Sequence, residues 1–402
     1  MRPPAAGRIA EPFDGETGVE ESAPVTGTAL TRVRPHATAM LFMKAGRPHE
    51  PVAVPQVLLG AGDLLVEVEF STLCGSDVHT VQGHRVEPAP AVLGHEAVGR
   101  VTAIGGVVPA LDGVPLVPGD RVVWSVTAPC STCDACRAGV PDSCRSPRKY
   151  GHERIGQGWE LTGGFATHVH LRAGTAVARV DESIPASVLA PAGCGISTAW
   201  AALAAAERSN PLAGATVLVA GAGLIGLAVT AMAHERGAAV IVSEPNEDRR
   251  RLAHRFGAAV TIDPNAGESP RSVLGGRKLR GRHDINIAIE ASGSAFAVST
   301  VIDAVASAGT VVLVGSVFPT EPVMLLPERV VRSQLTITGV HNYRSLHLQE
   351  ALQFLSDHWR AYPFEQFVGR IYPLDALDEA LDRAGRHREV RVGVAPTGST
   401  RR

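Results

Sequence analysis

Among its 402 residues the sequence has no apolar run of about 18 residues or more, the length that a bilayer-spanning helix requires. We therefore expect no membrane span. The chain also has no basic excess, because 38 Lys and Arg face 40 Asp and Glu and leave a formal net charge of -2. Nucleic-acid-binding proteins usually carry a positive surface, so the composition gives no support to a nucleic-acid partner.

Residues 1–36 lack the apolar segment of a secretory signal and are rich in Pro, Ala, Gly, Thr and Glu. We expect a disordered N-terminal extension there, and a cytoplasmic protein. The whole chain has only six cysteines. In a reducing compartment, clustered cysteines favour metal binding over disulfides.

The length of the chain exceeds the usual size of one hydrophobic core, so two domains are expected. In residues 37–195, short strand-like runs are separated by Gly and Pro turns, as in Leu64–Phe70, Ala97–Ile104 and Asp120–Val126. This spacing predicts a β-rich, barrel-like domain.

Residues 196–340 alternate apolar strands with helical segments, beginning with the strand Thr216–Ala220 and the helix Gly226–Arg236. Such alternation predicts a doubly wound parallel sheet, so the whole chain is an α/β protein. Residues 341–402 offer helical segments and two short strands, the last of them Glu389–Val394. This tail is too short for a domain of its own, and we expect it to return to the β-rich domain.

A G-x-G-x-x-G motif, residues 221–226, follows a predicted strand and opens a predicted helix, which is the context of a dinucleotide-binding loop. Gly221 permits the tight turn, Gly223 leaves room for a pyrophosphate, and Gly226 lets helix and strand approach closely. The helix N-terminus that follows Leu224 and Ile225 offers free N–H groups to phosphates. The alternative is a glycine-rich turn without a ligand.

Glu244 ends the next strand, 18 residues after Gly226. A carboxylate there can accept both ribose hydroxyls and repels a 2′-phosphate, so the sequence favours NAD over NADP. Arg249 and its two neighbours, Arg250 and Arg251, are the counter-argument, because a guanidinium can bind that phosphate. Their alternative role is a solvated helix face.

The six cysteines fall into two groups. Cys130, Cys133, Cys136 and Cys144, within residues 128–146, have the spacing C-x2-C-x2-C-x7-C and can close one tetrahedral zinc site. A nucleic-acid zinc finger and a disulfide pair are the competing interpretations. Cys74 and Cys194 lie far apart, each among Gly, Ser and Thr, and suggest a second metal site that keeps a position open.

Five ordered motifs over residues 39–395 resemble the zinc-containing medium-chain alcohol dehydrogenases. The resemblance implies a GroES-like catalytic domain, a Rossmann domain that binds NAD, two zinc ions per chain, and oxidation of a small alcohol or reduction of a carbonyl. The motifs are Cys74-Gly75-Ser76-Asp77-Val78-His79, Gly94-His95-Glu96, the four-cysteine lobe, Gly193-Cys194-Gly195-Ile196-Ser197-Thr198, and the glycine loop.

By the same resemblance, Cys74, His95 and Cys194 hold the catalytic zinc and leave its fourth position to water or substrate. Zinc there acts as a Lewis acid on the alcohol, which gives its hydride to the nicotinamide. The proton leaves through Ser76, the nicotinamide ribose and His79, whose usual pKa of about 6.5 suits release near neutral pH. Taken singly, these two residues are a turn serine and a surface histidine.

Three further positions follow from the resemblance. Glu96 is either a carboxylate that supports or transiently binds the metal, or a buried partner of an arginine. Arg391 occupies the place of a pyrophosphate-binding arginine, with a surface ion pair as the alternative. Asp77 is expected to orient the segment from Ser76 to His79.

The loop between Cys144 and Phe165 is expected near the substrate. Four side chains there and just before His95 suggest an anionic alcohol, by their charge and hydrogen-bonding groups: Arg85, Lys149, His152 and Trp159. The segments 149–153, 191–194 and 339–343 are similar to a branch linked to phosphonate metabolism, which implies a hydroxyalkyl phosphonate. The stretch 195–197 departs from that branch.

Three alternatives stay open. One is a polyol, amino-alcohol or cyclitol dehydrogenase of the same mechanism, another a non-catalytic dinucleotide-binding sensor or structural protein. The third, a zinc-ribbon nucleic-acid binder, is disfavoured by charge. The family also implies a homodimer or homotetramer, in which a late strand such as Thr310–Val314 extends a sheet across a two-fold axis.

Overall fold

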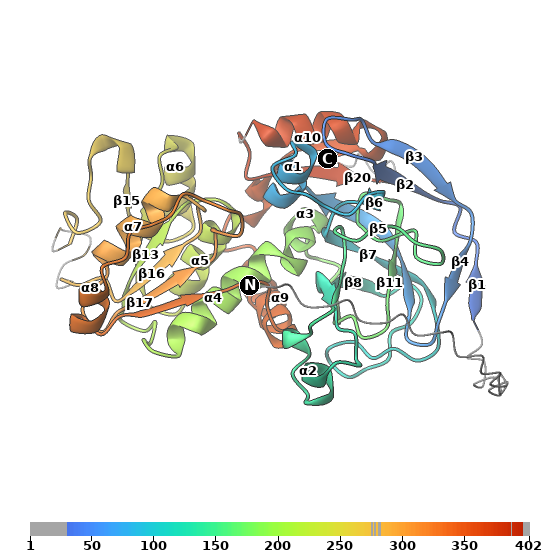
Figure 1. Cartoon of the computed structure of the whole chain (residues 1–402), viewed down its shortest axis with the longest axis horizontal. Coiled ribbons are helices and arrows are strands. Elements are labelled where there is room, and N and C mark those ends of the chain that lie inside the picture. Colours follow the sequence, from blue (N-terminus) through green and yellow to red (C-terminus); the bar gives the residue numbers. More distant parts are fainter. Residues whose placement is uncertain (1–29, 275, 277–278, 280–282, 387, 397–402) are drawn as a thin grey trace, which may run out of the picture.

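The computed structural model describes residues 30–274, 276, 279, 283–386 and 388–396, and it has two lobes (Figure 1). The expected N-terminal extension lies largely outside the described residues, because 1–29 are not among them. Its last residues depart from the expectation: β1 (Thr31–Val33) pairs antiparallel with β4 (Val57–Leu59). Ordered structure therefore begins before residue 37.

The β-rich lobe is built on a seven-stranded sheet in the order β12-β8-β7-β5-β20-β19, with β11 also paired to β5. Its strands are β5 (Leu64–Thr72), β7 (Glu96–Ile104), β8 (Arg121–Trp124), β11 (His168–Leu171), β12 (Val177–Arg179), β19 (Val368–Pro373) and β20 (Arg391–Ala395). Smaller sheets comprise β2 (Ala37–Phe42), β3 (Glu50–Val54) and β6 (Ala91–Val92), and the pair β9 (Thr127–Ala128) and β10 (Arg148–Lys149).

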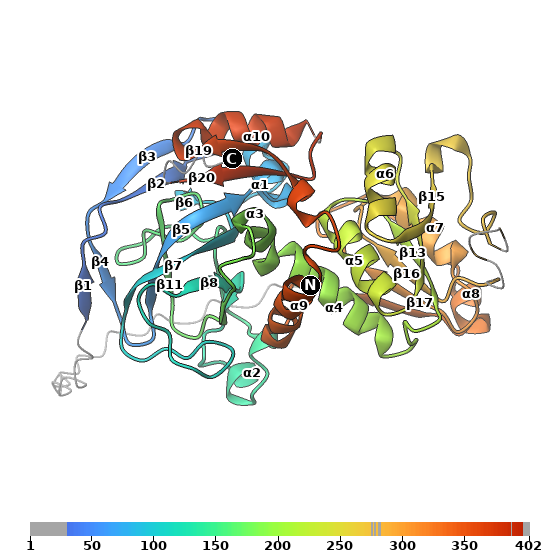
Figure 2. The same ribbon diagram turned by 180° about the vertical axis from the view of Figure 1, so that it is seen from behind.

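The C-terminal segment joins this first lobe. Strand β20 pairs antiparallel with β5, with Gly393 opposite Thr72 and Val394 opposite Ser71. Val392 and Val394 are buried, and burial of their apolar surface favours the pairing. Figure 2 shows β19, β20 and α10 (Leu377–Gly385) beside the strands from the start of the described chain.

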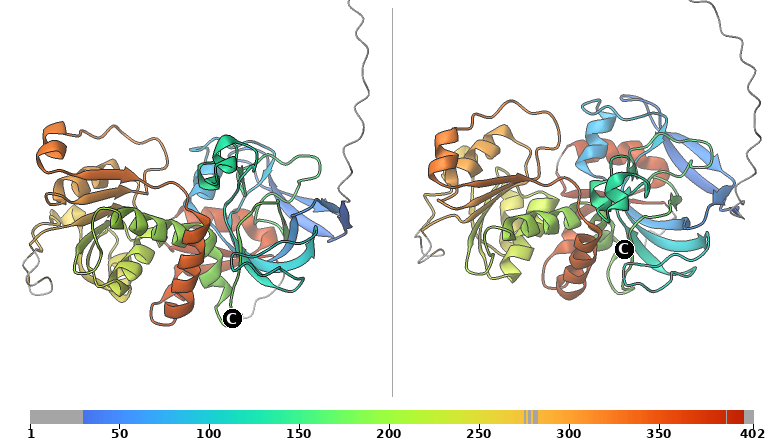
Figure 3. Two further views of the ribbon diagram at one scale, coloured as in Figure 1. Left: turned by 90° about the horizontal axis from the view of Figure 1, so that it is seen from below. Right: turned by 60° about the horizontal axis from the view of Figure 1, so that its bottom comes forward.

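The second lobe has a six-stranded parallel sheet in the order β15-β14-β13-β16-β17-β18. All five residues of β13 are buried, as expected for a strand covered on both faces. Figure 3 shows helices on both sides of the sheet. The strands are β13 (Thr216–Ala220), β14 (Ala239–Ser243), β15 (Ala258–Ile262), β16 (Ile287–Glu290), β17 (Thr310–Leu313) and β18 (Thr336–Gly339).

The helices of the described residues differ widely in length. The second lobe contains α4 (Gly195–Glu207), α5 (Leu224–Glu235), α6 (Glu247–Arg255), α7 (Ala295–Ala304) and α8 (Pro327–Arg332). Besides α10, the other helices are α1 (Gly75–Val81), α2 (Asp134–Arg137), α3 (Ala186–Leu189) and α9 (Ser345–His358). Short 3-10 helices span Pro141–Ser143, Ala190–Gly193, Pro264–Ala266, Phe364–Phe367 and Leu374–Ala376.

One core of buried apolar residues crosses the junction between the lobes. It runs from Phe70 and Val123 in the β-rich lobe to Val217 and Ile289 in the parallel sheet. Helix α9 packs against α4 at this junction. The strand order reverses between β13 and β16, which is where ligands bind in sheets of this topology. The shared core therefore fixes how that crevice faces the β-rich lobe.

The strand expected to pair across a two-fold axis, Thr310–Val314, does not lie at the edge of its sheet, so this prediction is wrong. β17 lies between β16 and β18, so its edges are already paired, and β18 is the outer strand of the sheet. Strand β18 was not predicted, because its four residues lack a continuous apolar run.

Among the described residues, no single helix has both the length and the hydropathy of a membrane span. One bent pair, Ala186–Gly193 with Gly195–Glu207, meets the length and composition criteria together.

An aromatic cluster anchors the C-terminal segment to the second lobe and offers a test of the junction. Phe256 is fully buried, stacks on Phe367 and meets Phe364 edge to face. We expect Phe256→Ala to lower the free energy of unfolding by about 3–5 kcal/mol through lost apolar contact and an unfilled cavity. Urea unfolding measures this, and a loss below about 1 kcal/mol would contradict it.

Candidate metal and dinucleotide sites

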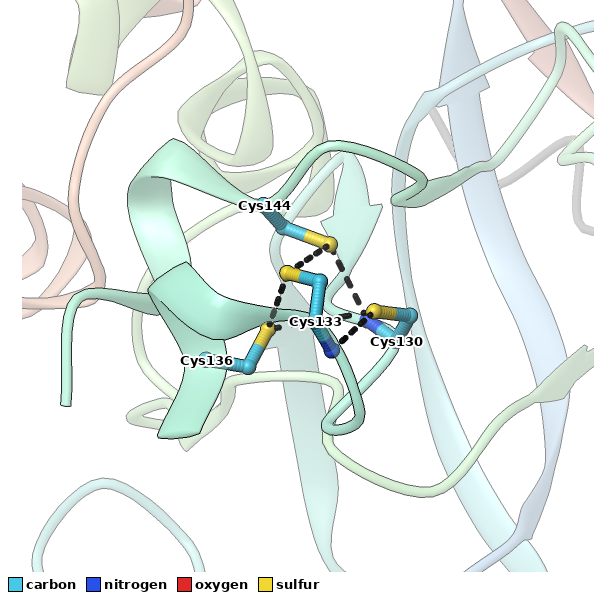
Figure 4. A group of neighbouring side chains, drawn as sticks. All are labelled: Cys130, Cys133, Cys136 and Cys144. Carbon is cyan, nitrogen blue, oxygen red and sulfur yellow. Dashed lines mark hydrogen bonds between the residues drawn. The ribbon is translucent and has the colours of Figure 1, made fainter. Parts of the chain in front are cut away.

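The local cysteine lobe brings four sulfurs together around α2 (Figure 4). Sγ–Sγ distances are 3.5 Å for Cys133–Cys136, 4.0 Å for Cys130–Cys136 and 4.0 Å for Cys133–Cys144. Sulfurs bound tetrahedrally to zinc at about 2.3 Å lie about 3.8 Å apart. All four thiols are free of disulfides. The geometry therefore fits a closed zinc site.

Backbone and hydroxyl groups prepare this lobe for a cation. The Cys130 N–H donates to Cys144 Sγ at 3.2 Å, and the Cys133 N–H donates to Cys130 Sγ at 3.4 Å. Hydrogen bonds from Thr132 lower the pKa of the Cys130 thiol to about 5. A thiolate is the form of cysteine that binds metal, so these bonds favour metal loading.

The second donor group is assembled from distant segments. Cys74 precedes α1, His95 precedes β7, and Cys194 precedes α4. One donor atom from each, with a carboxylate oxygen of Glu96, lies within 4.8 Å of the others. Two sulfurs and one imidazole are the ligand set of zinc sites that keep a position open.

Asp77 holds two of these segments in place. Its carboxylate accepts from the Cys74 N–H at 2.9 Å and from the Gly94 N–H at 3.3 Å, and lies 3.6 Å from His95 Nδ1. Burial lowers the pKa of His95, but Asp77 and Cys74 raise it to about 10. A hydrogen bond with Cys194 holds the pKa of Cys74 well below its usual value. The cluster thus attracts positive charge, which fits a divalent metal.

Glu96 and Arg391 form a buried ion pair behind the donor group. The two N–O distances are 2.8 Å and 2.9 Å, and Thr72 donates to Glu96 at 2.6 Å. Arg391 also approaches Cys74 Sγ at 3.9 Å. Glu96 thus has an arginine partner, as one of its two interpretations expected. Its carboxylate also lies beside the donor group, as the other interpretation requires. Arg391 lines the cleft, and its role at a pyrophosphate stays a prediction because Glu96 already engages its guanidinium.

The glycine loop joins β13 to α5 as the motif requires. Gly221 has φ +100°, a conformation that L side chains rarely adopt, and a Cβ on Gly226 would lie 1.9 Å from the Gly221 carbonyl oxygen. A Cβ on Gly223 would meet nothing within 4 Å. Leu224 and Ile225 open α5 and line the adjoining cleft. The loop therefore leaves space for a phosphate at the helix N-terminus.

Glu244 lies at the end of β14 beside this loop. Its carboxylate accepts from the Ala222 N–H at 2.7 Å and the Asn246 N–H at 2.9 Å. The three arginines of α6 differ in role: Arg250 binds the Glu244 carbonyl, Arg251 pairs with Glu247 and Asp248 on the exposed face, and Arg249 lines the cleft. Of the three, Arg249 is the one that lines the cleft.

Glu290, at the end of β16, was not among the predicted site residues. This fully buried carboxylate accepts from the Ser292 N–H and the Gly293 N–H at 2.6 Å and 2.7 Å, and from the Ser316 hydroxyl at 3.2 Å. It thereby fixes the two loops that follow β16 and β17. An acidic residue closing an apolar strand was the available signal.

A cleft of about 910 Å³ lies between the lobes and contains the donor group and the glycine loop. Ser76 and His79 line it from one face of α1, three residues apart, and Ser76 Oγ lies 3.4 Å from His95 Nε2. The ring of His79 lies 4.6 Å from that of Phe318, which belongs to the loop after β17. The two residues expected to move the proton thus lie on the same wall of the cleft.

Three of the four predicted substrate residues line this cleft: Arg85, Lys149 and His152. Arg85 Nε lies 2.5 Å from Glu87, and His152 Nδ1 lies 2.9 Å from the same carboxylate. Burial, aided by His95, holds the pKa of His152 well below its usual value, so this ring is neutral. The cationic groups of the wall are therefore Arg85 and Lys149, not His152.

Trp159 was wrongly placed at the substrate. Its side chain is buried in the core of the β-rich lobe, and its indole N–H donates to the His170 carbonyl at 2.9 Å. Arg148 covers the ring, with its guanidinium carbon 4.9 Å from the ring centroid. Proximity to Lys149 in sequence was misleading because the loop folds back on the sheet.

Comparison with known proteins gives two matching family models, the alcohol dehydrogenase GroES-like domain over residues 60–182 and the zinc-binding dehydrogenase over residues 225–357. An L-threonine 3-dehydrogenase of Anaeromyxobacter sp. is 34% identical over 72% of this chain and 78% of its own. A 5-exo-hydroxycamphor dehydrogenase of Pseudomonas putida is 28% identical over 86% of this chain and 95% of its own.

Solved structures agree with these relatives. An alcohol dehydrogenase of Thermotoga maritima superimposes with a TM-score of 0.83 at 28% identity, covering 89% of this chain and 99% of its own. A protein of Sinorhizobium meliloti described as a zinc-binding dehydrogenase, bound to NADP, has a TM-score of 0.77 at 27% identity over 90% and 99%.

The two donor groups predict a zinc content that separates them. We expect wild-type protein to bind two zinc ions per chain. Cys133→Ser should bind one, because the lobe then lacks one of the four thiolates that complete its tetrahedral site. Inductively coupled plasma mass spectrometry measures the content. Cys194→Ser should instead spare the lobe zinc, and an equal loss of both ions in each variant would contradict two independent sites.

Proposed function

The chain belongs to the zinc-containing medium-chain dehydrogenase family, and from this premise we propose that it oxidises an anionic alcohol with NAD, or reduces the matching carbonyl. The observation that carries the substrate class is the position of Lys149 and Arg85 in the wall of the cleft that contains Cys74, His95 and Cys194. A hydroxyalkyl phosphonate is the specific substrate we propose.

In this proposal Cys74, His95 and Cys194 hold the catalytic zinc, and the four-cysteine lobe holds a structural one. Zinc bound there supplies a Lewis acid that lowers the pKa of the alcohol. Asp77 orients His95, and the Glu96–Arg391 pair supports the site from behind. These buried neighbours fix the direction of each ligand before substrate arrives.

Proton release is assigned to Ser76 and His79. Ser76 Oγ, 3.4 Å from His95 Nε2, would accept the proton of the substrate hydroxyl, and His79 would release a proton toward solvent. Their positions on one face of α1 support this order. Phe318 packs over His79, with 4.6 Å between the ring centroids.

For the cofactor we propose NAD. Glu244 places a buried carboxylate beside the glycine loop, where a 2′-phosphate would be repelled. Arg249 is the feature that favours NADP, and the relative bound to NADP shows that the fold accepts it. The buried carboxylate outweighs one arginine on the cleft wall.

An amino alcohol is the second candidate substrate. The L-threonine 3-dehydrogenases among the relatives favour it, and Glu87 gives the wall a carboxylate beside its cations. A zwitterion needs an unengaged carboxylate, however, and Glu87 already contacts Arg85 and His152. A non-catalytic sensor is disfavoured, because it has no need for the metal donors together with Ser76 and His79.

The proposed assembly is a homodimer or homotetramer in the cytoplasm, where free thiols persist. Strand β18 is the outer strand of its sheet, and exposed apolar side chains lie in the preceding segment, among them Met324, Leu326 and Val331. Such a surface beside an unpaired strand edge favours pairing with a second copy. Light scattering would measure the mass.

The cationic wall predicts a selective effect on KM. Lys149→Ala and Arg85→Ala should each raise KM about tenfold or more for a phosphonate alcohol, because a charged hydrogen bond or its field is lost. A neutral alcohol of equal length should be affected far less. NADH formation by zinc-loaded protein measures both, and equal effects on the two alcohols would contradict an anionic substrate.

The cofactor proposal has its own test. Glu244→Gln should reduce the preference for NAD over NADP by about tenfold, since the repulsion of the 2′-phosphate is lost while the size of the side chain is kept. The measurement is the ratio of kcat/KM for the two cofactors. Arg251→Gln, on the exposed face of α6, is the control, and a ratio unchanged in both variants would contradict the role of Glu244.

A further inference from the structure

Behind the wall of the cleft lies a carboxylate, Glu87, that no sequence motif indicates. Glu87 lies between α1 and β6, and only 6% of its side chain is exposed. It stands behind Arg85 and His152, which line the cleft, and its Oε1 contacts both of them, at 2.5 Å and 2.9 Å. A buried carboxylate so placed fixes the position and the charge of the wall.

Arg85 is held from two sides. Glu87 engages its Nε, and Phe318 lies under its guanidinium, with 5.8 Å between the guanidinium carbon and the ring centroid. An ion pair in this half-buried setting cancels most of the field that Arg85 would present to a ligand. Arg85 therefore contributes shape and hydrogen bonds more than net charge.

Lys149 is in a different state. Its ammonium forms no ion pair within the described part of the chain, although the charge of Glu87 acts on it from farther away. Its side chain is partly buried on the cleft wall. Its pKa is lowered, first by burial and then by the charge of Arg85. A half-desolvated cation without a partner gains most from an anionic ligand group.

Resting on the proposed dehydrogenase function, we propose that Glu87 is a specificity-determining residue that limits the substrate to a single negative charge. By neutralising Arg85 it leaves one net cation, Lys149, to receive the acidic group of the alcohol. A dianion would bring a second charge that the wall does not balance. The site thus takes a carboxylate, a sulfonate or a singly ionised phosphonate.

The test separates charge from shape. Three alcohols share one hydroxyalkyl chain and end in a sulfonate, a phosphonate or a neutral carboxamide. At mildly alkaline pH the sulfonate carries one charge and the phosphonate mostly two, while both groups are tetrahedral. Dissociation constants are measured by calorimetry on zinc-loaded protein saturated with NADH, a complex in which an alcohol binds without being oxidised.

For wild-type protein we expect the sulfonate to bind about tenfold more tightly than the carboxamide and several-fold more tightly than the phosphonate. Glu87→Gln keeps the size of the side chain and unmasks Arg85, so the phosphonate should overtake the sulfonate. Arg85→Gln leaves Glu87 unpaired, so both anions should bind more weakly relative to the carboxamide, and the doubly charged phosphonate should lose more than the sulfonate. The two variants thus move the selectivity in opposite directions.

The matched control lies one residue away. Lys149→Met should abolish the advantage of the sulfonate over the carboxamide, whereas Arg148→Met should keep it, because Arg148 packs on Trp159 outside the cleft. A sulfonate-to-phosphonate ratio unchanged in both Glu87→Gln and Arg85→Gln would overturn the proposal. Because no turnover is needed, this result is distinct from failure of the dehydrogenase function, which would appear as no NADH from any of the three alcohols with NAD.

Discussion

The buried ion pair between Glu96 and Arg391 is the interaction on which the rest of the site depends. Glu96 begins β7, Arg391 begins β20, and β5, which carries Thr72, lies between these strands in the sheet. A buried charge is tolerated only when it is paired and hydrogen-bonded, so this pair requires the three strands to keep one register. That register sets Cys74 and His95 at the end of their strands, facing the cleft. A C-terminal residue thereby completes a site whose ligands lie in the first half of the chain.

The same arrangement explains why the reaction site lies between the lobes. The donor group is at the edge of the β-rich sheet, and the glycine loop is at the carboxyl ends of the parallel strands, where Glu290 fixes the neighbouring loops. The two edges face each other because a continuous apolar core, with α4 and α9, joins the lobes. Cys194 precedes α4, so one helix both carries a metal donor and packs in the core beside α5, the helix of the glycine loop. Metal and cofactor sites are therefore coupled through packing rather than through a flexible connection.

The cationic side chains of the cleft differ in whether a buried carboxylate pairs with them. Most cationic side chains there have a partner that fixes them: Arg391 has Glu96, and Arg85 has Glu87. Lys149 differs, since its ammonium forms no ion pair among the described residues and feels the charge of Glu87 only from farther away. In a site closed to water, one unpaired cation attracts an anionic ligand more strongly than several paired cations do, because its field is not cancelled locally. Substrate selection in this protein is thus expected to depend on ion pairs behind the wall as much as on the residues that touch the ligand.

The sequence by itself determined the elements and the chemistry of short motifs. Strand Thr216–Ala220 was predicted with its observed bounds, because a buried parallel strand is a continuous apolar run. The glycine loop and the cysteine lobe are likewise local, so spacing alone predicts their geometry. Tertiary structure decided what depends on distant contacts. It paired Arg391 with Glu96, placed Trp159 in the core, made β18 the edge of its sheet, and set Glu87 behind Arg85 and His152. None of these follows from periodicity, because each depends on which segments the shared core brings together.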